Sequence, residues 1–350
     1  MKRRKRKTTG NVPSELLPTG SAILNCILAD NPYGGWRKGT IANLIGDSSA
    51  GKSILAFTTF AAINQIGYDE YRFIYDDAEC AKDSFNADKL FGKSTMERIE
   101  SPRIDSEGEP VYSDTIEDFH MYVKDAIDAK EPFIYILDSF DSLDAEDDEK
   151  KIEAALKAKR KGNKDVPGSY GTAKPKKSSA ILRNIRADIK KTNSLLIIVS
   201  QIRDNLNAGT FGSKKTRSGG RALKHYSWYE IWLHLGMQIK SKERMIGIES
   251  LPKVSKNRQT GKNRNGIITI YYDLGIDDVG SSVDFLIKEE YWKKTKQTIN
   301  ASEIDFKGTK QKLIEYIENN NLETELHEAV GTCWNEIEDS LKLNRKKRFK

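Results

Sequence analysis

One eight-residue segment of the chain carries the residue types and spacing needed to bind a nucleoside triphosphate. It matches the pattern G-x-x-x-x-G-K-[ST] and consists of Gly46, Asp47, Ser48, Ser49, Ala50, Gly51, Lys52 and Ser53. The glycines let backbone N–H groups curl around phosphate oxygens, and a helix that follows directs its positive end at the same anion. Lys52 is predicted to reach the β- and γ-phosphates of ATP, and the Ser53 hydroxyl is predicted to bind Mg²⁺.

Two other positions at strand ends suit the same chemistry. Asp138 follows an apolar run at 133–137, where a carboxylate would anchor the magnesium ion of a bound nucleotide. Gln201 ends the apolar run at 194–201 and is a candidate sensor of the γ-phosphate.

Hydrolysis also needs a base that orients water in line with the γ-phosphate. Asp76, Asp77 and Glu79 follow the strand-like residues 73–75 and are the candidates. Their spacing alone does not choose among them.

The elements that must hold these residues follow from the spacing of apolar side chains. Strand-like runs occur at 40–46, 71–77, 132–138 and 194–201, and recur at 229–239, 245–250 and 266–272. Helix-like spacing separates the first four runs, at 52–66, 115–130 and 178–191. This alternation predicts an α/β core with a mostly parallel sheet that has helices on both faces.

Composition divides the chain into three predicted parts. Residues 1–20 are a basic N-terminal tail and entry segment, and residues 21–285 form the core. Residues 286–350 form a small helix-rich C-terminal domain with a basic tail. Polar, basic stretches interrupt the core near 144–178 and 202–220, and we expect them to be loops.

The formal net charge of +7 is unevenly distributed. Residues 1–7 and 342–350 each carry six basic groups and no acid, and residues 150–177 and 202–224 together contribute +13. The rest of the chain therefore carries about −18. Such segregation favours a polyanionic partner contacted by these four segments. Ordinary solvated tails and loops are the alternative.

Several classes of protein are excluded. No apolar run approaches the roughly 20 residues that span a bilayer, and the basic start lacks the apolar region of a secretory signal. The isolated cysteines Cys26, Cys80 and Cys333 provide neither a disulfide framework nor metal-type spacing. These features predict a soluble intracellular protein without a membrane partner.

Taken in order, seven segments of the chain resemble those of the RecA-type recombinases, over about residues 17–285. Its length and loops are similar to those of phage-encoded members. The segments are LPTGSAILN (17–25), GDSSAGKS (46–53), YDDAECAKD (75–83), YILDSFDSL (135–143), NSLLIIVSQIR (193–203), TFGSKKTRSGGRALKHY (210–226) and KVSKNR (253–258). The stretch from SQIR to SGGRALKHY is the most specific, because other phosphate-loop ATPases have no reason to carry it. The resemblance implies a RecA-like ATPase core.

The resemblance also implies roles at the nucleotide. It makes Glu79 the water-activating base, acting with Lys52 and Gln201. It places Asp83 near the adenine, with Tyr272 stacked on that base. Lys256 and Arg258 match a basic pair that reaches the nucleotide of the neighbouring subunit, although the second position is usually lysine.

For DNA, the resemblance makes Gln201 the link between the γ-phosphate and a second DNA loop at 202–220. The implied DNA contacts are Arg183, Arg203, Phe211, Gly212, Ser213, Lys214, Lys215, Arg217, Gly219, Gly220 and Arg221. Basic side chains beside flexible glycine-rich backbone also suit sequence-independent contact with phosphates.

The sequence thus predicts a DNA-dependent ATPase that uses ATP and Mg²⁺. We expect it to form helical filaments on single-stranded DNA and to pair that DNA with homologous duplex for strand exchange. The expected location is the cytoplasm, that of the bacterial host if the protein is phage-encoded. The main alternative is a RecA-fold hexameric helicase or ring-shaped DNA motor. Further alternatives are a DNA-binding mediator that lacks ATPase activity and a nucleotide switch unrelated to DNA.

Two departures from the family bear on assembly and regulation. Only about 16 residues precede the match, where bacterial members have a longer docking helix. Polymerisation would then use the Leu16-Leu17 region or be weaker. The C-terminal tail is basic where the bacterial tail is acidic, and we expect it to promote DNA capture.

Overall fold

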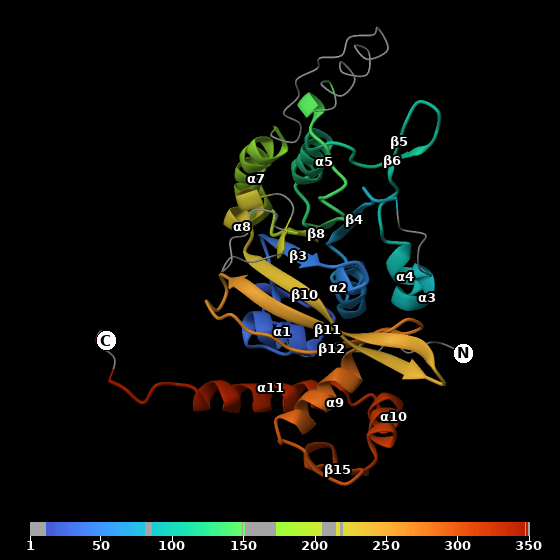
Figure 1. Cartoon of the computed structure of the whole chain (residues 1–350), viewed down its shortest axis with the longest axis vertical. Coiled ribbons are helices and arrows are strands. Elements are labelled where there is room, and N and C mark those ends of the chain that lie inside the picture. Colours follow the sequence, from blue (N-terminus) through green and yellow to red (C-terminus); the bar gives the residue numbers. More distant parts are fainter. Residues whose placement is uncertain are drawn as a thin grey trace.

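The centre of the molecule is a nine-stranded sheet. This computed structural model describes residues 12–80, 86–148, 150, 173–204, 215–217, 220–346 and 348. Five neighbouring strands run parallel, in the order β4 (Arg72–Asp76), β7 (Phe133–Leu137), β8 (Leu195–Asp204), β3 (Thr40–Gly46) and β10 (Tyr229–Ser241) (Figure 1). The predicted α/β class with a parallel core is confirmed.

The sheet continues beyond β10 with strands that the alternating pattern did not predict to be antiparallel. They are β11 (Arg244–Asn257), β12 (Ile268–Tyr271) and β13 (Gly275–Asp277). No helix separates these runs in the sequence, so each strand turns back directly beside the last. On the other side of β3, the short strand β9 (Lys215–Arg217) pairs antiparallel with the end of β8.

Helices cover both faces of the parallel strands. The helices α1 (Ala22–Ala29) and α2 (Lys52–Ile66) share one buried cluster with Leu195, Ile197 and Val199 of β8. On the other face lie α5 (Ile116–Asp128), α7 (Ala173–Lys191) and α8 (Gly220–Tyr226), which share a second cluster with the alternate residues of β8. Because both faces are buried, β8 is apolar along most of its length rather than alternating. The helix predicted at 178–191 begins five residues earlier, at Ala173.

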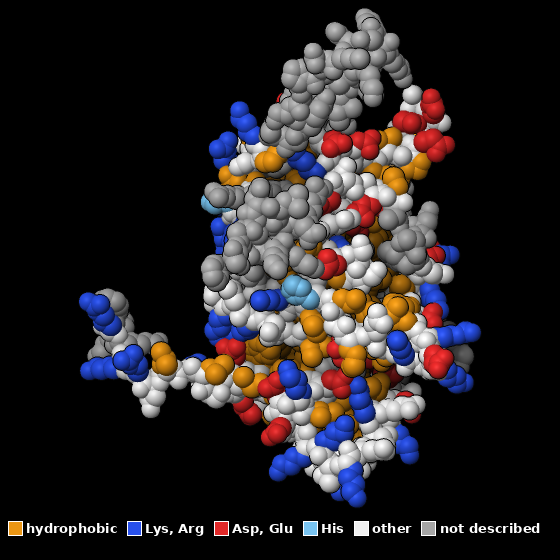
Figure 2. Space-filling view, in the orientation of Figure 1, with side chains coloured by type: hydrophobic (Ala, Val, Ile, Leu, Met, Phe, Trp, Pro, Cys, Tyr) orange, Lys and Arg blue, Asp and Glu red, His pale blue; other side chains and the backbone are white. Residues whose placement is uncertain are grey.

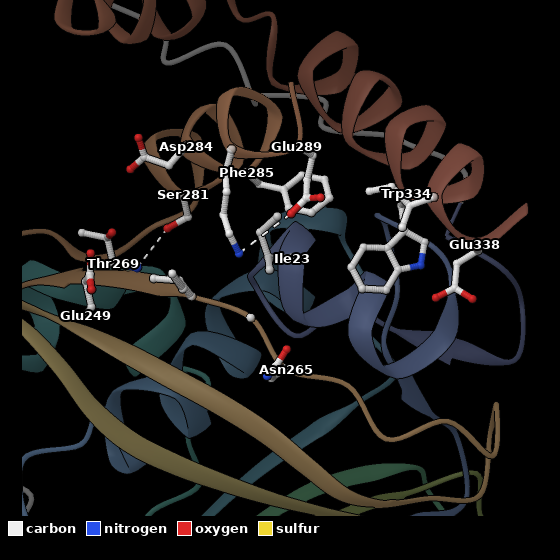
Figure 3. Close-up of a pocket in the computed structure, with 14 residues that line it drawn as sticks. Ile23, Glu249, Asn265, Thr269, Ser281, Asp284, Phe285, Glu289, Trp334 and Glu338 are labelled. Atoms are coloured by element: carbon white, nitrogen blue, oxygen red, sulfur yellow. Dashed lines mark hydrogen bonds and ion pairs between the residues drawn. The ribbon is translucent and has the colours of Figure 1, made fainter. Parts of the chain in front are cut away.

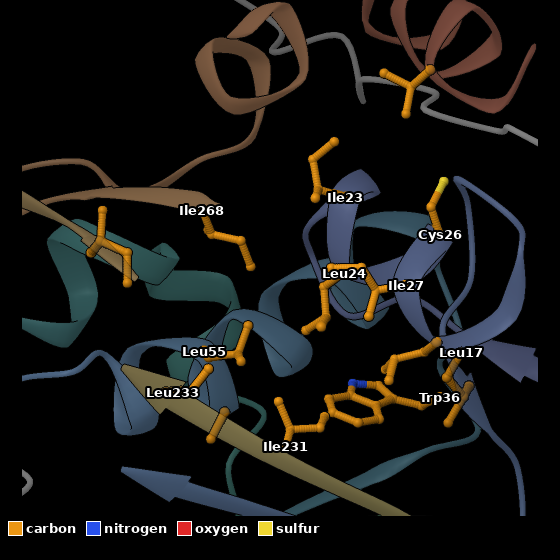
Figure 4. Close-up of a cluster of buried hydrophobic side chains, with 14 of the residues drawn as sticks. Leu17, Ile23, Leu24, Cys26, Ile27, Trp36, Leu55, Ile231, Leu233 and Ile268 are labelled. Atoms are coloured by element: carbon orange, nitrogen blue, oxygen red, sulfur yellow. The ribbon is translucent and has the colours of Figure 1, made fainter. Parts of the chain in front are cut away.

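The predicted entry segment is part of the core. The strands β1 (Leu16–Leu17) and β2 (Trp36–Arg37) pair antiparallel. Leu17 and Trp36 pack among side chains of α1, α2 and β10 (Figure 4). Trp36 donates from its indole nitrogen to the Thr59 hydroxyl at 3.1 Å. Leu16 and Leu17 are only 2% and 0% exposed, because the subunit's own core buries their side chains. The two alternatives for assembly, use of this region or weaker polymerisation, stay predictions.

The C-terminal region contains a small sheet as well as helices. Its strands are β14 (Lys293–Thr295), β15 (Thr298–Ala301) and β16 (Phe306–Gly308), and its helices are α9 (Asp278–Lys288), α10 (Lys310–Asn320) and α11 (Glu323–Ser340). Strands of three or four residues are too short to give a period in the sequence, so they were not predicted. The helix α9 packs against α1, α10 and α11 and spans the predicted boundary at 285, which stays a prediction.

Short elements complete the described chain. They are α3 (Ala87–Phe91), α4 (Lys93–Met96), β5 (Arg103–Ile104), β6 (Pro110–Val111) and the 3₁₀ turn η2 (Ser302–Ile304). None of the helices that could be searched in the described ranges has the length and hydropathy to cross a membrane. Figure 2 shows acidic side chains gathered at the β5–β6 end and basic ones on the C-terminal segment that leaves the body after α11.

Candidate nucleotide site and its links to the DNA loops

The carboxyl ends of four neighbouring parallel strands bring the predicted nucleotide residues to one edge of the sheet. The strand β3 leads into the phosphate loop, β7 into Asp138, β4 into Glu79, and Gln201 lies on β8 directly opposite Gly46. Parallel α/β sheets bind ligands at this edge, because all the loops that follow the strands meet there.

The phosphate loop curls around the Lys52 ammonium. Lys52 Nζ donates to the carbonyl oxygens of Gly46 and Asp47, at 3.0 and 2.9 Å. Burial lowers the pKa of Lys52, although the carboxylates of Asp138 and Glu79 act in the opposite direction. Ser48 and Ser49 are exposed at the tip of the loop. The helix α2 begins at Lys52, so its positive end faces the curl.

Gly51 is required at the start of α2 for both conformation and space. Its φ of +90° is left-handed, which L side chains rarely adopt, and an added Cβ would lie 2.4 Å from Ile270 Cδ1 of β12. Ala50, one residue earlier, is buried and its carbonyl accepts a hydrogen bond from the Ser250 hydroxyl at 2.7 Å. The antiparallel extension of the sheet therefore supports the back of the loop.

Ser53 and Asp138 form a pair of oxygen ligands suited to magnesium. The Ser53 hydroxyl donates to Asp138 Oδ2 at 2.6 Å, and Asp138 is 5% exposed. Burial raises the pKa of Asp138 to about 6; the hydrogen bond from Ser53 opposes this rise and the Glu79 carboxylate adds to it. A divalent cation would offset the cost of the buried negative charge, and hard oxygen ligands are those that Mg²⁺ prefers.

The three acids at the end of β4 and just after it lie in different environments. Asp76 is buried and accepts hydrogen bonds from the backbone and hydroxyl of Ser113, at 2.9 and 2.6 Å, and from the Tyr135 hydroxyl at 2.5 Å. Burial raises the pKa of Asp76. Asp77 is 3% exposed and accepts a hydrogen bond from the Tyr75 hydroxyl at 3.3 Å. Among the three, only Glu79 is exposed, so it alone has a carboxylate that solvent reaches readily.

Glu79 contacts the candidate γ-phosphate sensor. Gln201 Nε2 donates to Glu79 Oε1 at 2.8 Å, and the Ser139 hydroxyl donates to the same oxygen. A residue of β8 and residues that follow β4 and β7 are thus joined at one atom. A water molecule held by Glu79 would be sensitive to any movement of the Gln201 side chain.

Comparison with known proteins finds similarity to RecA proteins. The model of the RecA N-terminal domain family matches residues 151–277, a range that contains the SGGRALKHY and KVSKNR segments. Protein RecA of Acinetobacter baylyi is 28% identical over 318 residues, which cover 90% of this chain and 82% of that protein. Protein RecA of Rickettsia prowazekii is 29% identical over 307 residues, with 88% and 81% covered, and that of Malacoplasma penetrans is 24% identical over 308 residues, with 88% and 84% covered.

Over about nine tenths of its length the chain is therefore similar to proteins named RecA, which supports a place in the RecA-type recombinase family. The observed α/β core is consistent with this similarity.

The basic pair that the family resemblance directs at a neighbour's nucleotide lies at the end of α8. Lys256 Nζ donates to the carbonyl oxygens of Lys224 and His225, the latter at 3.0 Å, and Arg258 Nη2 donates to His225 O at 2.9 Å. Cations at a helix C-terminus satisfy its last carbonyls and complement its dipole. In this single subunit the pair therefore stabilises α8, the helix that follows the predicted second DNA loop.

Tyr272 lies 50% exposed in the turn between β12 and β13. The next residue, Asp273, forms an ion pair with Lys89 of α3 at 2.8 Å, so this turn lies beside the segment that follows Glu79. Asp83, the other residue predicted near the adenine, lies outside the described residues.

The roots of the predicted second DNA loop form a short hairpin. Arg203 of β8 pairs with Thr216 of β9, and Ile202 pairs with Arg217, so strand pairing extends into the stretch expected to be loop. The helix α8 begins at Gly220. Arg183 is exposed on α7. The predicted contacts Phe211, Gly212, Ser213, Lys214 and Gly219 lie outside the described residues, as do the side chains of Arg203, Lys215, Arg217 and Arg221.

Sequence reasoning missed three side chains near the site. They are Ser139, Asp141 and Lys174. The first two lie in the segment YILDSFDSL, where polar residues closely follow Asp138, and that polar run was the available signal.

A separate cavity of about 420 Å³ lies between the core and the C-terminal helices (Figure 3). Its lining includes Ile23, Phe285, Trp334 and Glu338, and none of the nucleotide residues described above. Arg264 bridges Asp30 and Glu338, at 2.6 Å each, and so ties α11 to the core at the rim of this cavity.

Proposed function

We propose that this RecA-type protein is a DNA-dependent ATPase that assembles as a helical filament on single-stranded DNA and exchanges strands with a homologous duplex. The observation that carries the proposal is the Gln201–Glu79 hydrogen bond of 2.8 Å. It joins the candidate base for hydrolysis to the strand that leads into the second DNA loop. A protein whose ATP turnover responds to DNA needs such a connection.

ATP is proposed to bind with its phosphates in the loop formed by Gly46–Ser53. Lys52 would leave the loop carbonyls to contact the β- and γ-phosphates, and Tyr272 and Asp83 would lie at the adenine. Ser53 and Asp138 would hold Mg²⁺, which neutralises charge on the phosphates when bound. Glu79 would accept a proton from the attacking water while its carboxylate is held by Ser139 and Gln201.

Single-stranded DNA is proposed to bind along the two basic stretches at 144–178 and 202–220. The first stretch comes after β7 and the second begins in the last residues of β8, so both start from the same edge of the sheet. Backbone phosphates would be contacted by lysine and arginine, which makes binding independent of base sequence and dependent on salt. The basic tails are proposed to help capture DNA.

Assembly is proposed to bury each nucleotide between neighbouring subunits, with Lys256 and Arg258 acting on the neighbour's phosphates. Such an interface is head-to-tail, which generates a filament when the rotation does not close. The proposed location is the cytoplasm, that of a bacterial host if the gene is carried by a phage.

Electron microscopy with single-stranded DNA and a slowly hydrolysed ATP analogue tests the proposal. Filaments on DNA that require the nucleotide would support it, and the Lys52→Ala variant should fail to form them. Closed six-fold rings that unwind duplex would instead support the alternative, a RecA-fold hexameric helicase or ring-shaped motor.

A further inference from the structure

The loop after β7, from Ser139 to Leu143, contacts several functional elements at once. Its first residue, Ser139, donates to the carboxylate of Glu79. The backbone N–H of Phe140 donates to Val199 O at 2.9 Å, which holds the loop against β8. The loop thus lies between the nucleotide edge and the strand that leads into the second DNA loop.

Beyond the last pair of β7 and β8, the Asp141 side chain accepts a hydrogen bond from the backbone of β8. The last paired residues of the two strands are Leu137 and Ile198. Three residues further along β8, the backbone N–H of Gln201 donates to Asp141 Oδ2 at 2.6 Å. Hydrogen bonds between a backbone N–H and a carboxylate are stronger than neutral ones. Asp141 therefore holds the main chain of Gln201 while Glu79 accepts from its side chain.

The same loop also anchors the other DNA segment. Lys174 lies in the first turn of α7, near the end of the basic stretch 144–178 predicted to contain the first DNA loop. Its Nζ donates to the carbonyl oxygens of Phe140 at 2.9 Å, of Asp141 at 3.4 Å, and of Leu143. The ammonium also lies over the Phe140 ring, 4.9 Å from its centroid. Movements of the loop would therefore reach the roots of both basic stretches.

We propose that Asp141 is a positioning residue that couples the nucleotide to the second DNA loop by holding the backbone of Gln201. When a γ-phosphate draws the Gln201 side chain from Glu79, two responses are available. With the backbone held, the strand and its β9 partner shift as a unit. Without this contact, the side chain rotates alone and the DNA loop is unaffected. The inference rests on the function proposed above, and the resemblance assigned no role to Asp141.

Substitutions of Asp141 in the full-length protein test this role. In the variant Asp141→Ala, the factor by which single-stranded DNA raises the rate of ATP hydrolysis should be about 10-fold smaller than in wild type. The reason is that one charge-assisted hydrogen bond is removed. Its Kd for Mg-ATP should stay within about twofold of wild type, because Asp141 is not proposed to contact the nucleotide. The nearly isosteric variant Asp141→Asn keeps an oxygen acceptor and should restore most of the stimulation. A matched control in the same loop is Ser142→Ala, which removes an exposed hydroxyl.

Where both Asp141 variants fold, three outcomes would overturn the inference. The first is full DNA stimulation in Asp141→Ala. The second is equal loss in Asp141→Asn and Asp141→Ala, since the acceptor oxygen would then not matter. If Asp141→Ala does not fold, as judged by its thermal transition, the Asn variant alone decides: retained stimulation supports the role, and loss in a folded protein overturns it. The third is a wild-type ATPase that DNA does not stimulate, which would also refute the proposed function. A wild type that is stimulated, with an Asp141→Ala variant that is equally stimulated, refutes only the role of Asp141.

Discussion

Arg258 donates a hydrogen bond from its guanidinium to the carbonyl oxygen of His225, at 2.9 Å, and so caps α8, the helix that follows the proposed second DNA loop. Lys256 contacts the same carbonyl at 3.0 Å. If these residues also reach a neighbour's nucleotide, they must leave α8 to do so. The helix C-terminus and the neighbouring phosphates then compete for one pair of cations.

Mixing two inactive variants should restore activity if Lys256 acts on the neighbour. Lys52→Ala lacks the phosphate-loop lysine and Lys256→Ala lacks the cation presented to the next subunit. In equal mixtures, about a quarter of head-to-tail interfaces would combine an intact Lys52 with an intact Lys256. We expect ATP turnover at about a quarter of the wild-type rate, measured as phosphate release on single-stranded DNA. Turnover no higher than the sum of the separate variants would show that Lys256 acts within its own subunit.

Glu79→Gln should separate binding from hydrolysis. It removes the proposed base but keeps a side chain that can contact Gln201 and Ser139, so ATP-dependent DNA binding should persist. Turnover should fall about 100-fold or more, in line with the loss of a general base. The comparison variant Asp76→Asn should instead lower the thermal transition, because Asp76 is a buried acceptor of three hydrogen bonds. Loss of DNA binding in a folded Glu79→Gln protein would give Glu79 a structural role.

Asp138→Asn should stabilise the metal-free protein at alkaline pH. The folded-state pKa of Asp138, about 6, exceeds its ordinary value of 3.8. The folded state therefore binds the proton more tightly, and stability falls as the pH rises from about 4 to 6. Above pH 6 the ionised carboxylate lowers the free energy of unfolding by up to about 3 kcal/mol. Asparagine carries no charge, so it removes this loss.

Urea unfolding in EDTA at pH 4 and pH 8 measures this effect. The free energy of unfolding of Asp138→Asn should exceed that of wild type at pH 8, and the two should be nearly equal at pH 4. Added Mg²⁺ should raise the stability of wild type and not of the variant. A gain that is equal at both pH values would contradict the assignment of the raised pKa to Asp138.

Neutralising the second DNA loop should reduce the salt dependence of single-strand binding. Each lost phosphate contact lowers the slope of log K against log salt by about 0.7. The triple variant of Lys214, Lys215 and Arg217 to alanine should therefore bind more weakly, with a slope lower by about 2. A control triple variant of Lys293, Lys294 and Lys307, which are exposed on β14 and β16, removes the same charge. Equal slopes in the two triple variants would refute specific contact by the loop.

Arg264→Ala should destabilise the attachment of α11. The Arg264 side chain is 9% exposed, pairs with Asp30 and Glu338, and stacks on Trp334 at 5.1 Å. Its removal leaves the partly buried carboxylates of Asp30 and Glu338 without this cation. The free energy of unfolding, measured in urea, should therefore fall by about 3 kcal/mol. Lys310→Ala, which removes an exposed pair with Asp284, should cost less than about 1 kcal/mol. Similar losses in the two variants would show that the Arg264 network contributes little.

The sequence by itself determined the α/β class, and it predicted the phosphate loop and the edge of the sheet where the site residues lie. The predicted phosphate loop is eight consecutive residues, so its pattern is visible without tertiary structure. The apolar runs that became β3, β4, β7 and β8 are likewise local, and parallel strands must end at one edge. The family resemblance added roles that the spacing had left open.

Only the tertiary structure decided which side chains contact each other. Asp76 and Glu79 are three residues apart, yet one is enclosed by Ser113 and Tyr135 while the other is exposed. Asp141 meets the backbone of Gln201 across 60 positions of sequence, and Leu16 and Leu17 turn inward because β1 pairs with β2. Local patterns depend on neighbours in the chain, whereas hydrogen-bond partners and burial depend on how distant segments pack.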